Sequence, residues 1–380
     1  MSNVSCQSMT SPEHQSKRRR WHGLVASAVV FGLTASAGGF GPGRGNVANA
    51  QTEATPNTVP QTPNTAPDPE PTAPPTFRPD PPSTTPVTQT PNEATTTSTT
   101  TSTTLPTGTG PTLAPVCGVP DGGGAGCRLI AYYGTPLSKG MGILGRLDKP
   151  TMLSSLKRDV QSWQKADPAT PTRCTMELVA VVAQASPGPS GLYRGRAAPE
   201  VVRRVLGWAR EAGCLLLLDI QVGWSSVAAE LPYLEPFLAE PDVHLALDPE
   251  WDMPPGVKPG TQIGTMDAAD INAAVALLDW LVNERKIGPK LLVVHRFREF
   301  MVTNPSRINT PPSIRLVANM DGFGTPERKL QSYAVALKGM PTRLSGFKLF
   351  TNPRLDTPML TPEQTLSGRV RPAPVFINYQ

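Results

Sequence analysis

A single (β/α)8 barrel, the TIM barrel of the α/β class, is predicted for residues 117–380 on three observations. Eight short apolar segments alternate with amphipathic segments along this part of the chain. The apolar segments are rich in Val, Ile and Leu, as are parallel strands that are buried on both faces. Polar residues cluster where these segments end, which is where barrel enzymes place their active sites.

Each predicted strand is short, apolar and bounded by polar, Pro or Gly residues. Residues 243–251 alternate between an apolar face and a small or polar face, as the outer and inner sides of a barrel strand do. A doubly wound open sheet is the alternative fold. The predicted strands are Leu129–Tyr133, Met176–Val182, Leu215–Gln221, Val243–Asp248, Lys290–His295, Ile314–Met320, Gly346–Phe350 and Pro374–Tyr379.

The segments between the strands carry apolar residues at helical spacing. In the first of them, Leu153, Leu156 and Val160 recur along one face, and Pro150 suits the first helical turn. The clear helices are Pro150–Ala166, Pro199–Ala212, Ala268–Lys286 and Pro326–Gly339, and the weaker ones are Ser226–Ala239 and Pro362–Ser367.

Residues 1–50 are predicted to be a secretory signal peptide. Four basic residues, Lys17 to Arg20, precede an apolar run from Leu24 to Phe40, and Ala48-Asn49-Ala50 supplies a cleavage pattern. The run is too short and too rich in small residues for a permanent span, which needs about 20 apolar residues. We therefore expect no membrane span after cleavage.

Residues 51–116 are predicted to be a disordered linker. They hold 16 Pro and 22 Thr and almost no large apolar residues, so they cannot bury a core. The globular domain is therefore residues 117–380. We expect a monomer that is secreted or associated with the cell wall.

Charge and motifs exclude several classes of function. The formal net charge is +5, but no run of basic residues lies beyond the first 20 positions, so nucleic-acid binding is not expected. Residues 140–145 match G-x-G-x-x-G, which would suit an oxidoreductase, yet the glycines do not lie directly in a strand-to-helix turn. An exported protein also has little access to NAD, and no cofactor is expected.

Cysteine usage agrees with export. Removal of the signal leaves Cys117, Cys127, Cys174 and Cys214, an even number, for which three pairings exist. Cys174 and Cys214 precede consecutive strands and would lie at the same end of a parallel pair, so we pair them, and Cys117 with Cys127. The chain has no CxxC motif, and His244 and His295 are the only histidines beyond the signal, so no metal site is expected.

The segment Asp248-Pro249-Glu250 contains the two predicted catalytic residues. Two carboxylates at i and i+2 of a strand share a face, roughly 7 Å apart along it. Burial of two like charges so close together raises the pKa of at least one of them. A protonated carboxyl group beside an ionised one is the arrangement that cleaves glycosidic bonds. We predict Glu250 as the general acid and Asp248 as the group that orients or stabilises.

Other polar and aromatic residues lie at the ends of the predicted strands. Aromatic rings beside carboxylates suit sugar rings, which stack their C–H faces on them. The predicted substrate-binding residues are Tyr132, Tyr133, Asp219, Gln221, Trp251, His295, Asp321 and Tyr379.

These motifs resemble exported (β/α)8 glycoside hydrolases of the chitinase and muramidase kind. Those proteins carry a D-x-E at the end of the fourth strand, as Asp248-Pro249-Glu250 does, and Met320-Asp321 is similar to their pair at the sixth strand. The resemblance implies retaining, substrate-assisted hydrolysis of an N-acetylated polysaccharide.

The sequence leaves two functions open. The first is an exported glycoside hydrolase acting on cell-wall or environmental polysaccharide. The chitinase motif has further Asp residues before its D-x-E, where this chain has His244 and Ala246. The alternative is therefore a barrel that binds carbohydrate or the cell wall and has lost its chemistry.

Overall fold

The structure is a computed structural model, and it describes residues 126–380. The predicted signal peptide, the predicted linker and Cys117 lie outside the described residues.

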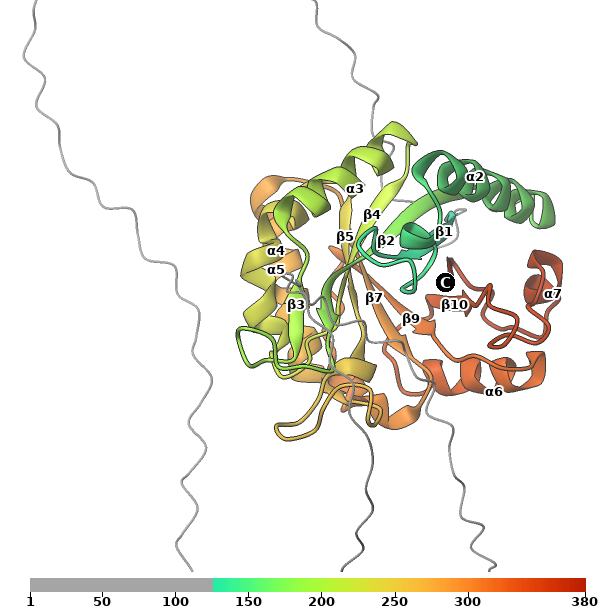
Figure 1. Cartoon of the computed structure of the whole chain (residues 1–380). Helices are drawn as coiled ribbons and strands as arrows, with labels where there is room; N and C mark the ends of the chain where they lie inside the picture. The colour runs from blue at the N-terminus through green and yellow to red at the C-terminus, as the bar shows by residue number, and fades with distance from the viewer. Residues whose placement is uncertain (1–125) are drawn as a thin grey trace, which may run out of the picture. The chain divides into compact units, whose positions relative to one another are not determined.

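Eight parallel strands in residues 126–380 form a closed barrel (Figure 1). Each pairs in parallel with the next, and the last pairs with the first through Leu129 and Phe376. This closure rules out the open sheet, and all eight predicted strands are confirmed. They are β1 (Arg128–Gly134), β2 (Thr172–Ala183), β4 (Leu215–Ile220), β5 (Val243–Leu247), β7 (Lys290–Arg296), β9 (Ile314–Met320), β10 (Ser345–Leu349) and β11 (Phe376–Tyr379).

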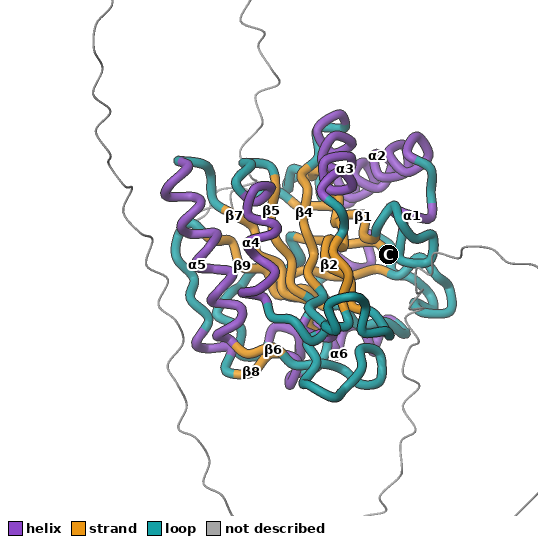
Figure 2. The backbone as a smooth tube through the Cα atoms, turned by 60° about the vertical axis from the view of Figure 1, so that its left-hand side comes forward, coloured by secondary structure: helices purple, strands orange, loops and turns teal. Residues whose placement is uncertain are grey.

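Short elements extend the barrel beyond the carboxyl ends of its strands. β3 (Arg194–Arg196) pairs antiparallel with the end of β2, and β6 (Met266–Asp267) pairs with β8 (Val302–Thr303). Figure 2 shows the β6–β8 pair at one end of the barrel, together with several long loops. The 3-10 turns are η1 (Pro249–Trp251), η2 (Glu299–Met301) and η3 (Pro305–Arg307).

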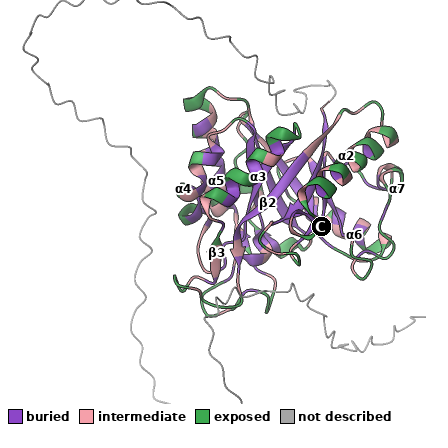
Figure 3. Ribbon diagram, turned by 45° about the horizontal axis from the view of Figure 1, so that its top comes forward, coloured by how far each residue is buried: buried purple, intermediate pink, exposed green. Residues whose placement is uncertain are grey.

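The helices surround the barrel, and most begin at a polar cap. The Asp148 carboxylate accepts a hydrogen bond from the Thr151 amide, and Asp267 and Asp270 form a reciprocal capping box. The outward faces of the helices are exposed, whereas the strands are buried (Figure 3). The helices are α1 (Ile143–Arg146), α2 (Lys149–Ala166), α3 (Pro199–Glu211), α4 (Val227–Leu238), α5 (Ala268–Arg285), α6 (Pro326–Leu337) and α7 (Pro362–Leu366).

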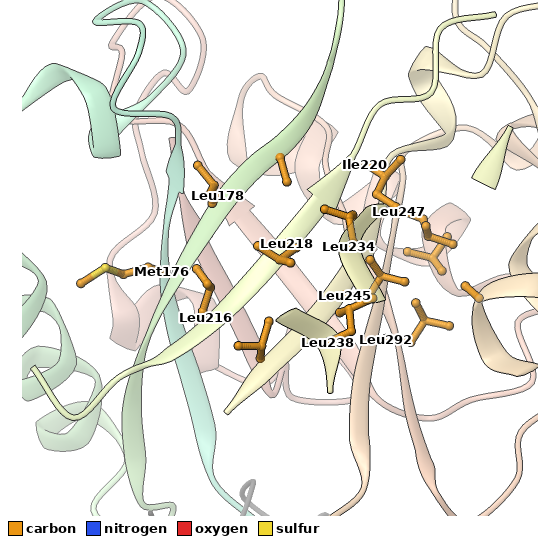
Figure 4. Packing of buried hydrophobic residues seen from close by; sticks show 14 of the residues in the cluster. Met176, Leu178, Leu216, Leu218, Ile220, Leu234, Leu238, Leu245, Leu247 and Leu292 are labelled. Atoms are coloured by element: carbon orange, nitrogen blue, oxygen red, sulfur yellow. The ribbon is translucent and has the colours of Figure 1, made fainter. Parts of the chain in front are cut away.

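Side-chain alternation along the strands produces two hydrophobic clusters. The larger lies between strands and helices, where Leu218 and Leu245 pack near Leu234 and Leu238 of α4 (Figure 4). The smaller cluster fills the interior of the barrel. Its buried members are Cys127, Leu129, Ala131, Leu215, Leu217, Ala246, Leu291, Val293, Val317 and Phe376.

A disulfide joins Cys174 and Cys214, as predicted. The register pairs Thr175 with Leu215, so the two cysteines are neighbours at the amino-terminal ends of β2 and β4. Their separation of 40 residues corresponds to a stabilisation of about 4 kcal/mol from the restricted unfolded chain. None of the helices between residues 126 and 380 has the length and hydropathy of a membrane span.

Candidate functional site

A polar layer closes the barrel interior at the carboxyl ends of the strands. The inward positions change there from aliphatic to polar residues, and nearly all of these are buried. Because they come from neighbouring strands, their side chains meet in one place. The layer contains Tyr133, Glu177, Asp219, Gln221, Asp248, His295, Asn319, Asp321, Lys348 and Asn378.

His295 lies at the centre of this layer. Its Nε2 is 3.0 Å from Glu177 Oε1, and its Nδ1 is 3.0 Å from the Asn319 amide nitrogen and 3.5 Å from Asp321 Oδ2. Burial alone would lower the pKa of His295, but the hydrogen bond and charge of Glu177, with the charges of Asp321 and Asp219, raise it to about 10. The carboxylates around His295 therefore favour its charged form, and Asn378 donates to the second oxygen of Glu177 at 2.9 Å.

Lys348 is a second buried basic residue of the same polar layer. Its Nζ is 2.8 Å from Asp321 Oδ1 and 4.1 Å from the centre of the Tyr133 ring. Burial opposes its charge, but Asp321 and Asp248 outweigh that effect and raise the pKa of Lys348. The backbone oxygen of Lys348 accepts a hydrogen bond of 2.7 Å from Lys329, which also contacts Asp356 at 2.6 Å.

Three acids near these cations have pKa values above their ordinary range. Burial and neighbouring carboxylates raise the pKa of Asp219 and of Asp248 to about 7. Burial, followed by the charge of Asp248, raises the pKa of Glu250 to about 8. Both carboxyl oxygens of Asp219 and Oδ1 of Asp248 are buried without a hydrogen-bond partner. Glu250 keeps part of its surface exposed, whereas Asp219 and Asp248 are buried.

The expected strand geometry of the D-x-E segment is wrong. β5 ends at Leu247, and Pro249 starts the 3-10 turn η1, which carries Glu250. Proline has no N–H to continue the sheet, so the chain turns there. The turn brings the acids together nonetheless: one oxygen each of Asp248, Glu250 and Asp321 lies within 4.8 Å of the other two.

The structure brings together five of the eight predicted substrate-binding residues and separates others from them. Tyr133, Asp219, Gln221, His295 and Asp321 lie in the polar layer with Asp248, and Gln221 Nε2 donates to the Tyr133 hydroxyl at 3.1 Å.

Tyr132 and Tyr379 do not belong to this layer. The Tyr132 hydroxyl donates to Asp159 of α2 at 2.5 Å, and the Tyr379 hydroxyl accepts from Trp163 Nε1 at 2.9 Å. Both rings lie in the cluster between strands and helices, because their strand positions face outward. Trp251 is buried in η1, with its ring close to Gly260.

Four residues of the layer were not among the predicted site residues: Glu177, Asn319, Lys348 and Asn378. Each is a single polar residue between two buried apolar neighbours in a strand, as Glu177 is between Met176 and Leu178. An isolated charge inside a strand buried on both faces is costly unless it is paired. That pattern was the signal that could have identified them.

The glycine-rich loop packs on the end of β1. Gly142 has φ +113°, and a Cβ there would lie 2.4 Å from the Tyr133 carbonyl oxygen. A Cβ on Gly145 would lie 2.1 Å from the Ser138 carbonyl oxygen. These glycines therefore permit close backbone packing beside the site, and α1 begins directly after Gly142.

Among the described residues, two groups could offer metal ligands. One is Glu177, Asp219 and His295, and the other is Asp248, Glu250 and Asp321. Carboxylate oxygens suit Ca²⁺ or Mg²⁺. The second group, however, already has the Lys348 ammonium 2.8 Å from Asp321. The residues fit proton transfer better than cation binding.

Comparison with models of known protein families finds no match for this chain, and a search of curated proteins finds no significant relative.

Proposed function

We propose that this protein is an exported glycoside hydrolase that cleaves a cell-wall or environmental polysaccharide, with Glu250 as the general acid. The observation that carries the proposal is the position of Glu250. Its pKa is raised to about 8, and its carboxyl group lies within 4.8 Å of Asp248 and Asp321 at the open end of the barrel. A carboxyl group that is protonated at neutral pH beside a carboxylate suits glycosidic cleavage.

In this proposal Glu250 donates its proton to the glycosidic oxygen as the bond from that oxygen to the anomeric carbon breaks. Asp321, paired with Lys348 and His295, presents a carboxylate that offsets the positive charge developing on the sugar ring. Asp248 lies beside Glu250, and its charge raises the pKa of that acid. Glu250 then accepts a proton from the water that attacks the anomeric carbon.

The short separation of the acids favours retention of configuration. Inverting enzymes hold their carboxyl groups about 6.5–9.5 Å apart to admit a water molecule, whereas retaining enzymes hold them about 5–5.5 Å apart. The carboxyl oxygens of Asp248, Glu250 and Asp321 are closer together than the separation that inverting enzymes need.

The test is release of reducing ends from chitin and peptidoglycan. We expect Glu250→Gln to lower the rate by about 10²–10⁴-fold, the contribution of a general acid. The matched control is Glu284→Gln, a change at an exposed position of α5, which should retain full activity. Equal activity of Glu250→Gln and the wild-type chain would disprove the role of Glu250.

A carbohydrate-binding protein without catalysis is the second candidate. The observation in its favour is that His244 and Ala246 face the barrel interior, where proteins of the chitinase kind have Asp. Sedimentation with insoluble chitin or peptidoglycan, together with an assay for released product, distinguishes the two functions. Binding without product favours this second candidate.

A further inference from the structure

We propose that a cavity beside the D-x-E turn is a second sugar-binding subsite, which holds a neutral or N-acetylated hexose unit of the same polysaccharide; this inference rests on the proposed function. The cavity has a volume of about 490 Å³ and lies between the loop after β4 and residues 252–265. Ligand pockets in proteins have volumes of about 300–1,000 Å³. Trp224, Ser225, Asp252, Gln262 and Thr265 are among its lining residues.

The walls of the cavity are attached to the backbone that carries Glu250. The amide of Gly264, a lining residue, donates to the Glu250 carbonyl oxygen at 2.7 Å. The Thr265 amide donates to the Asp252 carbonyl oxygen at 3.1 Å. A Cβ on Gly264 would lie 2.4 Å from that same Asp252 oxygen, so only glycine permits this approach. The cavity therefore lies directly beside the turn of the general acid.

Trp224 presents a fixed aromatic surface at this cavity. Its ring lies 4.3 Å from the Tyr193 ring, centre to centre, and its Nε1 donates to the Val257 carbonyl oxygen at 2.6 Å. With the N–H already bonded, the ring offers an apolar face, which suits the C–H face of a sugar. The side chain is partly exposed, so this surface is accessible.

Polar groups of the cavity complement the hydroxyl and amide groups of a sugar. Asp252 is half-buried and lines the cavity, where its carboxyl group can accept hydrogen bonds. The amide of Gln262 is exposed and can both donate and accept. One aromatic face with a few polar groups is the composition expected for a ligand pocket. The Asp252 carboxyl group at its wall disfavours acidic sugars.

Such a subsite predicts that catalysis improves with substrate length. Binding energy from a remote sugar unit supports the reaction at the cleaved bond, so short substrates lose rate as well as affinity. A one-unit aryl glycoside occupies only the cleavage position and does not contact the subsite. Changes in the subsite should therefore not affect its hydrolysis.

The test compares chito-oligosaccharides of two to six units with an aryl N-acetylglucosaminide. We expect Trp224→Ala and Asp252→Asn to lower kcat/KM for the hexamer about tenfold while leaving the aryl glycoside unchanged. Trp280→Ala is the matched control, because Trp280 is an exposed aromatic residue on α5. Gln262→Ala, at an exposed position that cannot perturb folding, should give a smaller loss in the same direction. Equal losses on both substrates, or none, would overturn the subsite.

A measurement of ligand binding tests the subsite independently of the proposed function. Calorimetric titration of chitohexaose into Glu250→Gln, with and without Trp224→Ala, measures the subsite without turnover. A weaker Kd in the double variant supports the subsite even if the wild-type chain releases no product. An unchanged Kd contradicts the subsite, whereas hydrolysis by the wild-type chain tests the function separately.

Discussion

The Lys348 ammonium group lies 2.8 Å from Oδ1 of Asp321, and both side chains are buried at the open end of the barrel. This pair places a fixed positive charge beside the acids Asp248 and Glu250. Lys348 lowers the pKa of Glu250, whereas burial and Asp248 raise it. The balance among these groups sets the protonation of the proposed catalytic site.

Replacement of Lys348 by Met is expected to destabilise the fold by about 3–5 kcal/mol, because the buried Asp321 carboxylate loses its 2.8 Å partner and keeps only the 3.5 Å contact with His295. Urea denaturation measures the loss. The control is Lys338→Met, which breaks the exposed pair with Glu299 and should change the stability little. Similar costs for the two variants would contradict the buried role of Lys348.

The rate should fall as pH rises through about 8. Glu250 must carry its proton to act as an acid, and its pKa is about 8. Asp248→Asn removes a charge that raises this pKa, so the alkaline limb of kcat/KM should move to lower pH. Glu284→Gln should leave the limb in place. A limb that stays fixed or moves upward in Asp248→Asn would refute this assignment.

His295 should stabilise the fold in a pH-dependent way. Its pKa in the folded chain, about 10, exceeds the ordinary value of 6.5, so its contribution is complete below pH 6.5 and is lost as pH rises toward 10. The difference in unfolding free energy between the wild-type chain and His295→Gln should shrink by about 1.4 kcal/mol per pH unit in that window. Urea midpoints at pH 6, 7.5 and 9 measure this difference, and a constant difference would argue against a buried imidazolium.

Removal of metal ions should leave activity unchanged. Lys348 and His295 already supply positive charge to the carboxyl groups that could bind a cation. Treatment with EDTA, followed by Ca²⁺ or Mg²⁺, checks this expectation. Loss of activity with EDTA and recovery with either ion would show that the acids Asp248, Glu250 and Asp321 hold a metal.

The disulfide should stabilise the barrel without contributing to catalysis. Cys174 and Cys214 lie at the amino-terminal ends of their strands, opposite the polar layer. The double change to Ser should lower the free energy of unfolding by about 4 kcal/mol. Assays well below the melting temperature should show unchanged kcat/KM, and a large drop in kcat there would link the two ends of the barrel.

Much of the barrel could be predicted from the sequence because its strands are buried on both faces. A run such as Leu215–Leu218 is apolar throughout, and the cysteine pairing followed from the order of the parallel strands. The D-x-E acids were found in the same way, from their position after a strand.

The side-chain directions in the site were harder to predict. Tyr132 and Tyr133 are adjacent, and only the pleat of β1 decides that Tyr133 faces inward while Tyr132 contacts Asp159. Glu177 was missed because its partner His295 lies on a distant strand, and Lys348 because its pairing with Asp321, at the end of the neighbouring strand β9, depends on register. Pairing across a closed barrel depends on three-dimensional register, which the local pattern does not contain.

The leaving-group dependence of Glu250→Gln tests the central claim most directly. A general acid matters for a sugar alcohol as leaving group but not for an acidic phenol, which departs without a proton. We expect the variant to lose about 10²–10⁴-fold in kcat on chitohexaose and to retain nearly full bond cleavage on a dinitrophenyl glycoside. Equal losses on both substrates would contradict Glu250 as the proton donor.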